Sequence, residues 1–361
     1  MQIDSLNCNW VMEMSNSPLH PYQNLSNRAY WNRSVSDRHF SRLDQLWDGM
    51  PLNKADKIAT AGSCFAQHLG QNLAKRGANF MDLEPAPSFL VTRELRRKYG
   101  YEIFSCRYGN IYTMRQLLQI FQEAFSIRVP HDIVWERGGR YFDALRPSVD
   151  PVGQADADTV NKLRSLHLAQ VRKMFESLDV FVVTMGLTEA WVSKEDSTVY
   201  PTAPGTIAGK FSTEKYEFAN FTFPEVYRDL SDFWEGLRSV NANARLLLTV
   251  SPVPLRATAS GQHVLPATTY SKSVLRAVAG DFSMREDSVY YFPAYELITS
   301  APGRGMYYEP DWRNVSPYGV DYVMEHFFRG VSAAELHSKD KRKLEVDVVC
   351  DEEAMFKAIE D

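Results

Sequence analysis

A short apolar stretch that ends at a glycine and a serine constrains the fold of this chain more than any other feature. Residues 58–61 have the composition of a buried β-strand, Gly62 ends that strand, and Ser63 stands before a helix predicted over residues 65–76. The apolar positions of this helix recur every four residues, and they are Phe65, Leu69 and Leu73. Gly77 ends the helix next to two basic residues. The junction therefore predicts a strand–turn–helix unit with a serine hydroxyl at the carboxyl edge of a sheet.

Ser63 at such a junction has the surroundings of a serine nucleophile. Its hydroxyl stands beside the unpaired backbone N–H groups and the positive end of the helix that follows. These groups stabilise the negative charge that develops when a serine attacks an ester. A serine that caps the helix gives the same sequence pattern, so both interpretations stand. Cys64 is likewise open to two interpretations, as a second nucleophile or as a small residue that fills the core.

Apolar strands alternate with helices along the rest of the chain, which is the pattern of an α/β protein. Further strands are predicted at residues 179–185, 245–250 and 289–292. The helices are predicted at residues 113–125, 159–178, 270–278 and 316–328, and within the helix–strand pair at 224–250. Strands that are apolar throughout need cover on both faces, as the strands of a parallel sheet do. We therefore predict an α/β fold with three layers, in which helices cover both faces of a parallel sheet.

The chain divides into three parts on composition. Residues 1–56 are polar and aromatic without sustained periodicity, and they are predicted to form an arm packed on the main domain. The residues expected to anchor this arm are Tyr30, Trp31, Phe40, Leu43, Leu46 and Trp47. Residues 57–330 are predicted to form the main domain, with a Pro- and Gly-punctuated surface insertion near residues 127–158. Residues 331–361 are charged, and a flexible C-terminal tail is predicted there.

Charge and cysteine content argue against several classes of function. A net charge of −5 gives no reason to expect a nucleic-acid partner. The four cysteines match no zinc-binding spacing and suit a reducing cytosol, so we expect no bound metal. The sequence has no signal-peptide pattern and no uninterrupted run of about 18 apolar residues. We therefore expect a cytoplasmic protein that does not insert into a membrane.

Polar residues gather at the predicted strand ends. In open α/β sheets, ligands bind outside the carboxyl ends of the strands, so those ends are expected to meet Ser63 in space. The stretches concerned are residues 186–191, residues 251–254, and residues 311–314, which precede the last predicted helix. A serine, a polar turn and a late acidic residue are how serine hydrolases of the SGNH type assemble their site.

The string Gly62-Ser63-Cys64-Phe65-Ala66 is similar to the signature of the GSCFA-domain family, a branch of the SGNH/GDSL hydrolase-like fold. The resemblance covers roughly residues 20–330. Further matching strings are residues 107–112, 186–191, 249–255, 263–276 and 291–296. The resemblance implies a flavodoxin-like α/β/α core and a role on acyl esters of sugars, and family members are often implicated in modifying bacterial surface polysaccharides.

The resemblance also implies roles for individual residues. Ser63 falls on the nucleophile, and the N–H of Gly109 falls on the second-block glycine that completes an oxyanion hole. Thr188 stands where the third block has an asparagine, and its hydroxyl is able to donate one hydrogen bond to the oxyanion. Asp311 keeps the position of the orienting acid. Asn314, however, replaces the histidine three residues later, and an asparagine cannot take a proton from serine at neutral pH.

The general base must therefore come from elsewhere, and the sequence leaves two candidates. His263 follows the 251–254 stretch and is the first of them. Lys272 is the second, because a desolvated lysine can act as a base. His263 is also open to substrate-binding and structural interpretations, and Lys272 to that of a solvated helix residue. His68, His167 and His326 lie within predicted helices and are interpreted as packing or surface residues.

Substrate contacts are expected near the same strand ends. The residues assigned to substrate binding are Asn110, Glu189, Trp191, Lys272, Arg313 and Asn314. Tyr200 and Trp312 are further aromatic residues that would stack on a sugar ring. For the aromatic residues, packing against the core is the alternative interpretation, and for Glu189 it is orienting a loop or pairing with an arginine.

Two functional hypotheses follow. The first is a carbohydrate O-acyl esterase or acyltransferase that works through an acyl-Ser63 intermediate, with a carbohydrate or another small ester as its substrate. The second is a carbohydrate-binding or assembly protein that kept the fold and lost hydrolysis. No bound cofactor is expected, and acyl-coenzyme A is the expected co-substrate if the reaction is a transfer. The sequence does not determine the oligomeric state.

Overall fold

The computed structural model describes residues 20–331 and residue 351, and the chain separates into two compact units between Leu46 and Trp47. In the first unit the described residues form three short helical turns, η1 (Asn27–Ala29), η2 (Asn32–Ser36) and η3 (Phe40–Arg42). Trp47, which the sequence assigned to the N-terminal arm, belongs to the second unit. Its ring packs against Phe292 and Phe327, with ring centroids 5.0 and 5.9 Å away.

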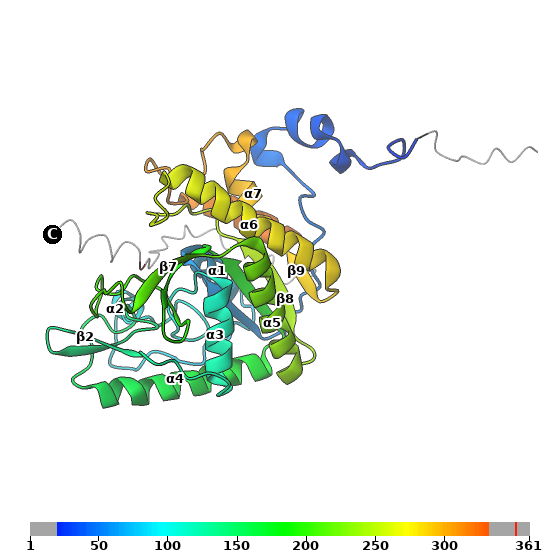
Figure 1. Ribbon diagram of the computed structural model, residues 1–361. Helices are drawn as coiled ribbons and strands as arrows, with labels where there is room; N and C mark the ends of the chain where they lie inside the picture. Colours follow the sequence, from blue (N-terminus) through cyan, green and yellow to red (C-terminus); the bar gives the residue numbers. More distant parts are fainter. Residues whose placement is uncertain (1–19, 332–350, 352–361) are drawn as a thin grey trace, which may run out of the picture. The chain divides into compact units, whose positions relative to one another are not determined.

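A four-stranded parallel sheet forms the centre of the second unit (Figure 1). Its strands are β1 (Ile58–Gly62), β4 (Val180–Met185), β8 (Arg245–Val250) and β9 (Val289–Tyr291), in the order β1-β4-β8-β9. Every residue of β1 and β4 is buried, as their apolar composition predicted. A single parallel bridge between Ile58 and Phe80 continues the pairing beyond β1.

Two groups of helices cover the sheet. The first contains α3 (Met114–Ala124), α4 (Ala157–Ser177), α5 (Phe223–Val240) and α6 (Val264–Arg285), in which α3 packs against α4 and α5, and α5 packs against α6 (Figure 1). The second contains α1 (Cys64–Lys75), α7 (Ala294–Thr299) and α8 (Pro317–Arg329), which meet at α8. Right-handed crossovers place the two groups on opposite faces of the sheet. The predicted three-layer α/β/α fold is confirmed. None of the described helices is long and apolar enough to cross a membrane.

Side-chain caps set most helix starts. Thr113 accepts a hydrogen bond from the N–H of Gln116 at the start of α3, and Ser316 accepts one from Gly319 at the start of α8. The start of α6 differs most from the prediction. This helix begins at Val264 rather than near residue 270, because His263 caps it and Pro266 is tolerated in its first turn. The six-residue α2 (Arg93–Lys98) was not predicted.

Two smaller sheets stand outside the central one. The predicted surface insertion near residues 127–158 contains a hairpin of β2 (Val134–Arg137) and β3 (Arg140–Asp143). Its turn residues Gly138 and Gly139 both have positive φ, which glycine adopts without strain. The other sheet contains β5 (Glu189–Ser193), β6 (Val199–Tyr200) and β7 (Tyr216–Asn220), in the order β6-β5-β7. It was not predicted, and it follows directly after the carboxyl end of β4.

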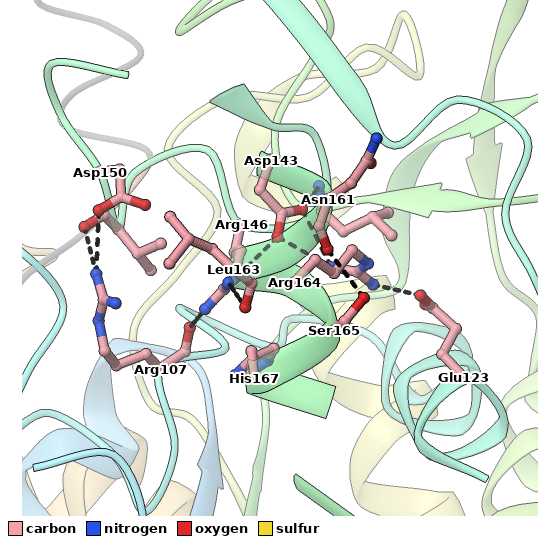
Figure 2. A network of polar contacts seen from close by, with 12 residues as sticks. Arg107, Glu123, Asp143, Arg146, Asp150, Asn161, Leu163, Arg164, Ser165 and His167 are labelled. Atoms are coloured by element: carbon pink, nitrogen blue, oxygen red, sulfur yellow. Dashed lines mark hydrogen bonds and ion pairs between the residues drawn. The ribbon is translucent and has the colours of Figure 1, made fainter. Parts of the chain in front are cut away.

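Part of the insertion is buried, where it forms an ion cluster with α3 and α4 (Figure 2). Arg164 of α4 binds both Glu123 of α3 and Asp143 of β3, with an Nη1–Oδ1 distance to Asp143 of 3.1 Å. Arg146 binds Asp143 at 2.7 Å. Burial alone would raise the pKa of Asp143, but Arg164 and Arg146 lower it to about 2. Asp143 is therefore a buried carboxylate held by two arginines.

The ion cluster also holds the loop that leads to the sheet edge. Arg146 donates to the carbonyl oxygen of Arg107 at 3.0 Å, and the Arg107 guanidinium binds Asp150 at 3.1 Å (Figure 2). The backbone N–H of Arg107 donates to Glu84, which also binds His167. Burial and Arg146 lower the pKa of His167 to about 4 although Glu84 opposes this, so the ring is neutral at pH 7. The cluster thus fixes the start of the 107–112 loop.

Candidate functional site

Ser63 lies between β1 and α1, where the sequence predicted it, but its hydroxyl does not cap the helix. Its backbone is extended, and the side chain makes no capping hydrogen bond. The hydroxyl oxygen is buried and has no hydrogen-bond partner among the described residues. Gly62 before it has φ of +136°, and a side chain there would meet the Thr184 carbonyl group. Of the two sequence interpretations, the helix cap is wrong for the side chain.

A small pocket surrounds Ser63 at the carboxyl ends of β1, β4 and β8. Its lining residues are Ser63, Cys64, Tyr112, Gly186, Leu187, Ser251, Val253, Pro254 and Lys272. Two of the three predicted strand-end stretches, 186–191 and 251–254, thus contribute to it. The 107–112 loop brings Tyr112 here, because the Tyr112 carbonyl oxygen accepts hydrogen bonds from the backbone N–H groups of Gly186 and Leu187 at 3.2 and 2.8 Å.

Lys272 is the residue with an amine that lines this pocket. It comes from α6 and is only 1% exposed. Its Nζ donates to the carbonyl oxygen of Gly186 at 2.7 Å, directly after β4. The neighbouring Ser271 accepts from the backbone N–H of Thr188 at 3.0 Å, which fixes α6 against the same strand end. Of the two base candidates, Lys272 is therefore the one that lines the Ser63 pocket.

His263 lies elsewhere. It is exposed at the start of α6, where its Nδ1 accepts from the backbone N–H of Leu265 at 3.2 Å, and it lines neither the Ser63 pocket nor the cavity beside it. His68 is buried in α1, where burial and Arg97 lower its pKa to about 4. No histidine among the described residues lines the Ser63 pocket.

Asp311 makes its hydrogen bonds within its own turn, to Arg313 and Asn314. Asp311 is exposed, and its Oδ1 accepts from the backbone N–H groups of Arg313 and Asn314 at 2.9 Å each. The Asn314 side chain donates to Asp311 Oδ2 at 2.7 Å. Burial would raise the pKa of Asp311, but these hydrogen bonds lower it. Neither Asp311, nor Arg313, nor Asn314 lines the Ser63 pocket or the cavity beside it, and Trp312 is exposed.

The predicted oxyanion and loop residues make other contacts. The Thr188 hydroxyl donates to Asn220 Oδ1 at 2.7 Å, so its hydrogen is directed at β7. Gly109 has φ of +70° in the loop before α3. The Asn110 side chain is buried, and its Nδ2 donates to Asp351 at 2.8 Å. None of Gly109, Asn110 and Thr188 lines the Ser63 pocket.

Asp351 is a site neighbour that the sequence did not indicate. The predicted C-terminal tail lies outside the described residues apart from Val331 and Asp351. Asp351 is buried, and the Tyr112 hydroxyl also donates to its Oδ2, at 3.5 Å. Burial raises the pKa of Asp351 despite hydrogen bonds from Ser148, Asn110 and Tyr112. A single aspartate in a charged stretch gives no sequence signal for such a position.

A larger cavity of about 210 Å³ adjoins the Ser63 pocket and shares Tyr112 and Leu187 with it. Glu189 and Trp191, both predicted to bind substrate, line this cavity together with Tyr200. The Glu189 Oε1 accepts from the Thr258 hydroxyl at 2.7 Å. Burial raises the pKa of Glu189, although hydrogen bonds from Thr258 and the Ala259 backbone oppose the rise. The fold therefore groups Ser63, Lys272, Glu189 and Trp191 at one sheet edge.

A family model described as the GSCFA family matches residues 57–327, which is most of the chain and includes both the Ser63 pocket and the adjoining cavity. A search of curated proteins gives no match.

Proposed function

We propose that this chain, which belongs to the GSCFA family, is a serine-dependent enzyme that removes or transfers an acyl group on a carbohydrate through an acyl-Ser63 intermediate. One observation carries the proposal. The Ser63 hydroxyl is buried at a strand–helix junction, makes no capping bond, and shares a pocket with the amine-bearing side chain of Lys272. Leaving a buried hydroxyl without a hydrogen-bond partner lowers the stability of the folded protein, and a functional role is a reason for such a group to be kept.

In the proposed reaction, Ser63 Oγ attacks the ester carbonyl carbon while the Lys272 amine takes the hydroxyl proton. The tetrahedral intermediate collapses, the bond to the leaving sugar oxygen breaks, and Lys272 returns its proton to that oxygen. Water or a second hydroxyl then attacks the acyl carbon while Lys272 takes its proton. The bond from the acyl carbon to Ser63 Oγ breaks, Lys272 returns the proton to Ser63 Oγ, and the acid or the acylated acceptor is released. Burial favours the uncharged form of an amine, which is the form that accepts a proton.

Hydrolysis and transfer share this acyl-enzyme. In hydrolysis a sugar ester supplies the acyl group and water accepts it. In a transfer acyl-coenzyme A is the proposed donor, so its thiol leaves in place of the sugar oxygen and a sugar hydroxyl accepts the acyl group. The cavity beside the Ser63 pocket is the proposed site of the carbohydrate, because it combines aromatic side chains with a carboxylate, which is the kind of surface that packs against a ring and accepts its hydroxyl hydrogens.

The test is intact-protein mass spectrometry after reaction with a fluorophosphonate. We expect one adduct on the wild type and on Cys64→Ala, and none on Ser63→Ala. Cys64→Ala is the matched control, because Cys64 is the adjacent nucleophile in the same pocket. An adduct that persists in Ser63→Ala, or a wild type that stays unlabelled while its circular dichroism spectrum is that of a folded protein, would contradict the proposal.

Replacing Gly186 by alanine is expected to slow this labelling roughly tenfold to a hundredfold, because a small displacement of a nucleophile is costly. The added Cβ would lie 2.9 Å from Ser63 Cβ and 3.0 Å from the Tyr112 carbonyl oxygen. The labelling rate is measured by time-resolved mass spectrometry. Gly280→Ala in α6 is the control, since its added methyl meets only the flexible end of Arg276, and it should label at the wild-type rate. If Gly186→Ala labelled at the wild-type rate, the close packing of Gly186 against Ser63 would not control the position of the Ser63 hydroxyl.

A second candidate function is carbohydrate binding without catalysis. The Asp311–Asn314 pair favours it, because these residues bind each other in an exposed turn and leave the position of the usual base without an imidazole. This candidate predicts a folded protein that binds carbohydrate and takes up no fluorophosphonate adduct.

A further inference from the structure

Three aromatic residues stand in one row across the small sheet β6-β5-β7. Trp191 of β5 is the register partner of Tyr200 on β6 and of Phe218 on β7, and all three side chains line the cavity beside Ser63. The Trp191 and Phe218 rings are 6.0 Å apart in an edge-to-face arrangement. Directly opposite residues of antiparallel strands share a face, so Trp191 and Phe218 form an aromatic wall of the cavity. Tyr200 supports this wall from the core, because its side chain is buried and its ring packs against Trp135 at 5.0 Å.

Glu189 stands on the same face of β5 as Trp191, because the two are separated by one residue. The Thr258 hydroxyl donates to the Glu189 carboxylate at 2.7 Å and holds it in place. Glu189 is the one charged residue among those that line the cavity, and the lining contains no lysine, arginine or histidine. The other polar lining residues are uncharged, and they are Tyr112, Thr113, Gln116, Tyr200, Thr202 and Thr258. Lys272 lines the neighbouring Ser63 pocket and not this cavity.

We infer that the cavity is a subsite for an uncharged, hydroxyl-bearing ring, and that Glu189 excludes ligands with a negative charge there. This inference rests on the proposed function, and it narrows the class of substrate that the proposed enzyme would accept. The aromatic wall packs against the C–H groups of a ring, and the fixed carboxylate accepts charge-assisted hydrogen bonds from its hydroxyls. An anionic ring would bring a second negative charge into a partly buried site with no cation to pair it.

The size of the cavity also favours a single ring as its occupant. About 210 Å³ is less than the roughly 300–1,000 Å³ of a typical site for drug-sized ligands, so the cavity suits a single ring rather than a large cofactor. The phosphate groups of an acyl-coenzyme A donor would then have to stay outside this cavity, which leaves it for the sugar.

The inference is tested by binding, which does not depend on whether Ser63 reacts. Dissociation constants are measured by saturation-transfer NMR titration for the methyl glucoside and the methyl galactoside, each against its own glucuronide or galacturonide. These pairs keep the ring and change a CH₂OH group to a carboxylate. In the wild type we expect the better neutral glycoside to bind at least about tenfold more tightly than its uronide, or 1.4 kcal/mol. In Glu189→Gln, which keeps the shape and an acceptor for Thr258, the ratio is expected to fall below about threefold.

Glu217→Gln is the matched control, because it makes the same change at an exposed position of β7 that does not line the cavity. It should leave the neutral-to-uronide ratio unchanged. Equal binding of the paired ligands by the wild type, tighter binding of a uronide, no binding of either, or an unchanged ratio in Glu189→Gln would each overturn the inference. If Ser63 labels but the ligands are not discriminated, only the subsite inference fails. If they are discriminated but Ser63 does not label, only the enzymatic proposal fails.

Discussion

Replacing Lys272 by methionine is expected to slow the reaction of Ser63 with a fluorophosphonate about a hundredfold to ten-thousandfold, the usual contribution of a general base. Methionine has a similar length but cannot accept a proton. The rate is measured by time-resolved intact-protein mass spectrometry on protein whose folding is checked by circular dichroism. Lys173→Met, at an exposed position of α4, is the matched control and should label at the wild-type rate.

A purely structural role for Lys272 is separated from a catalytic one by two further measurements. Lys272→Arg keeps a cationic donor for the Gly186 carbonyl oxygen but has no accessible neutral form, so it should be as slow as Lys272→Met. The wild-type labelling rate should rise with pH as a titration curve, and the curve should be absent in both variants. If the labelling rate of Lys272→Met were within about threefold of the wild-type rate, Lys272 would not be the general base, since a general base contributes much more to the rate.

Replacing Arg164 by methionine is expected to lower the free energy of unfolding by about 3–5 kcal/mol, which is the usual cost of removing one partner of a buried ion pair. Arg164 is buried between Glu123 and Asp143, so its loss leaves Glu123 without its cation and Asp143 with Arg146 alone. Urea denaturation at pH 7 measures the change. A loss below about 1 kcal/mol would mean that the cluster contributes no more than a surface ion pair.

Arg172→Met is the matched control on the same helix. Arg172 is exposed and pairs with Glu176 at 2.9 Å, so its replacement should change the free energy of unfolding by less than about 1 kcal/mol. The double variant Arg164→Met with Glu123→Gln should recover part of the loss, because it removes the carboxylate that Arg164→Met leaves unpaired.

The pH dependence of stability gives a second readout of the same cluster. The native pKa of Asp143 is about 2, against an ordinary value of 3.8, because Arg164 and Arg146 outweigh the effect of burial. Its contribution to stability is therefore present above about pH 4 and is lost as the pH falls toward 2. In Arg164→Met the native pKa of Asp143 should be higher, so the fall in stability between pH 4 and 2 should be smaller than in the wild type.

Local patterns in the sequence were sufficient for the layers of the fold and for the strand–turn–helix junction at Ser63. Buried apolar strands alternating with amphipathic helices indicated a covered parallel sheet, because such strands can exist only with both faces packed. The caps at Thr113 and Ser316 act between residues three positions apart, so their signals are also local. Ser63 was placed correctly for the same reason, since a strand, a glycine and a helix start are adjacent in the chain.

The proposed base and the proposed substrate cavity depend on contacts that no local pattern encodes. His263 and Lys272 are both base candidates from sequence, and the start of α6 separates them in space, because it takes His263 as its cap and carries Lys272 to the Gly186 carbonyl group. Asp311 lines neither the Ser63 pocket nor the cavity beside it, which a local pattern could not indicate because the position of Asp311 depends on how the loop before α8 folds.

The sequence by itself determined the three-layer fold, the position of Ser63 at the sheet edge, and the family to which the chain belongs, because all three rest on short, ordered strings of residues. Only the tertiary structure decided what surrounds that serine. Trp191 and Phe218, which line the cavity beside Ser63, are far apart in the chain and meet through the register of β5 and β7. Strand register, helix packing and burial all depend on contacts between residues far apart in the sequence, so they are established only when the whole chain is folded.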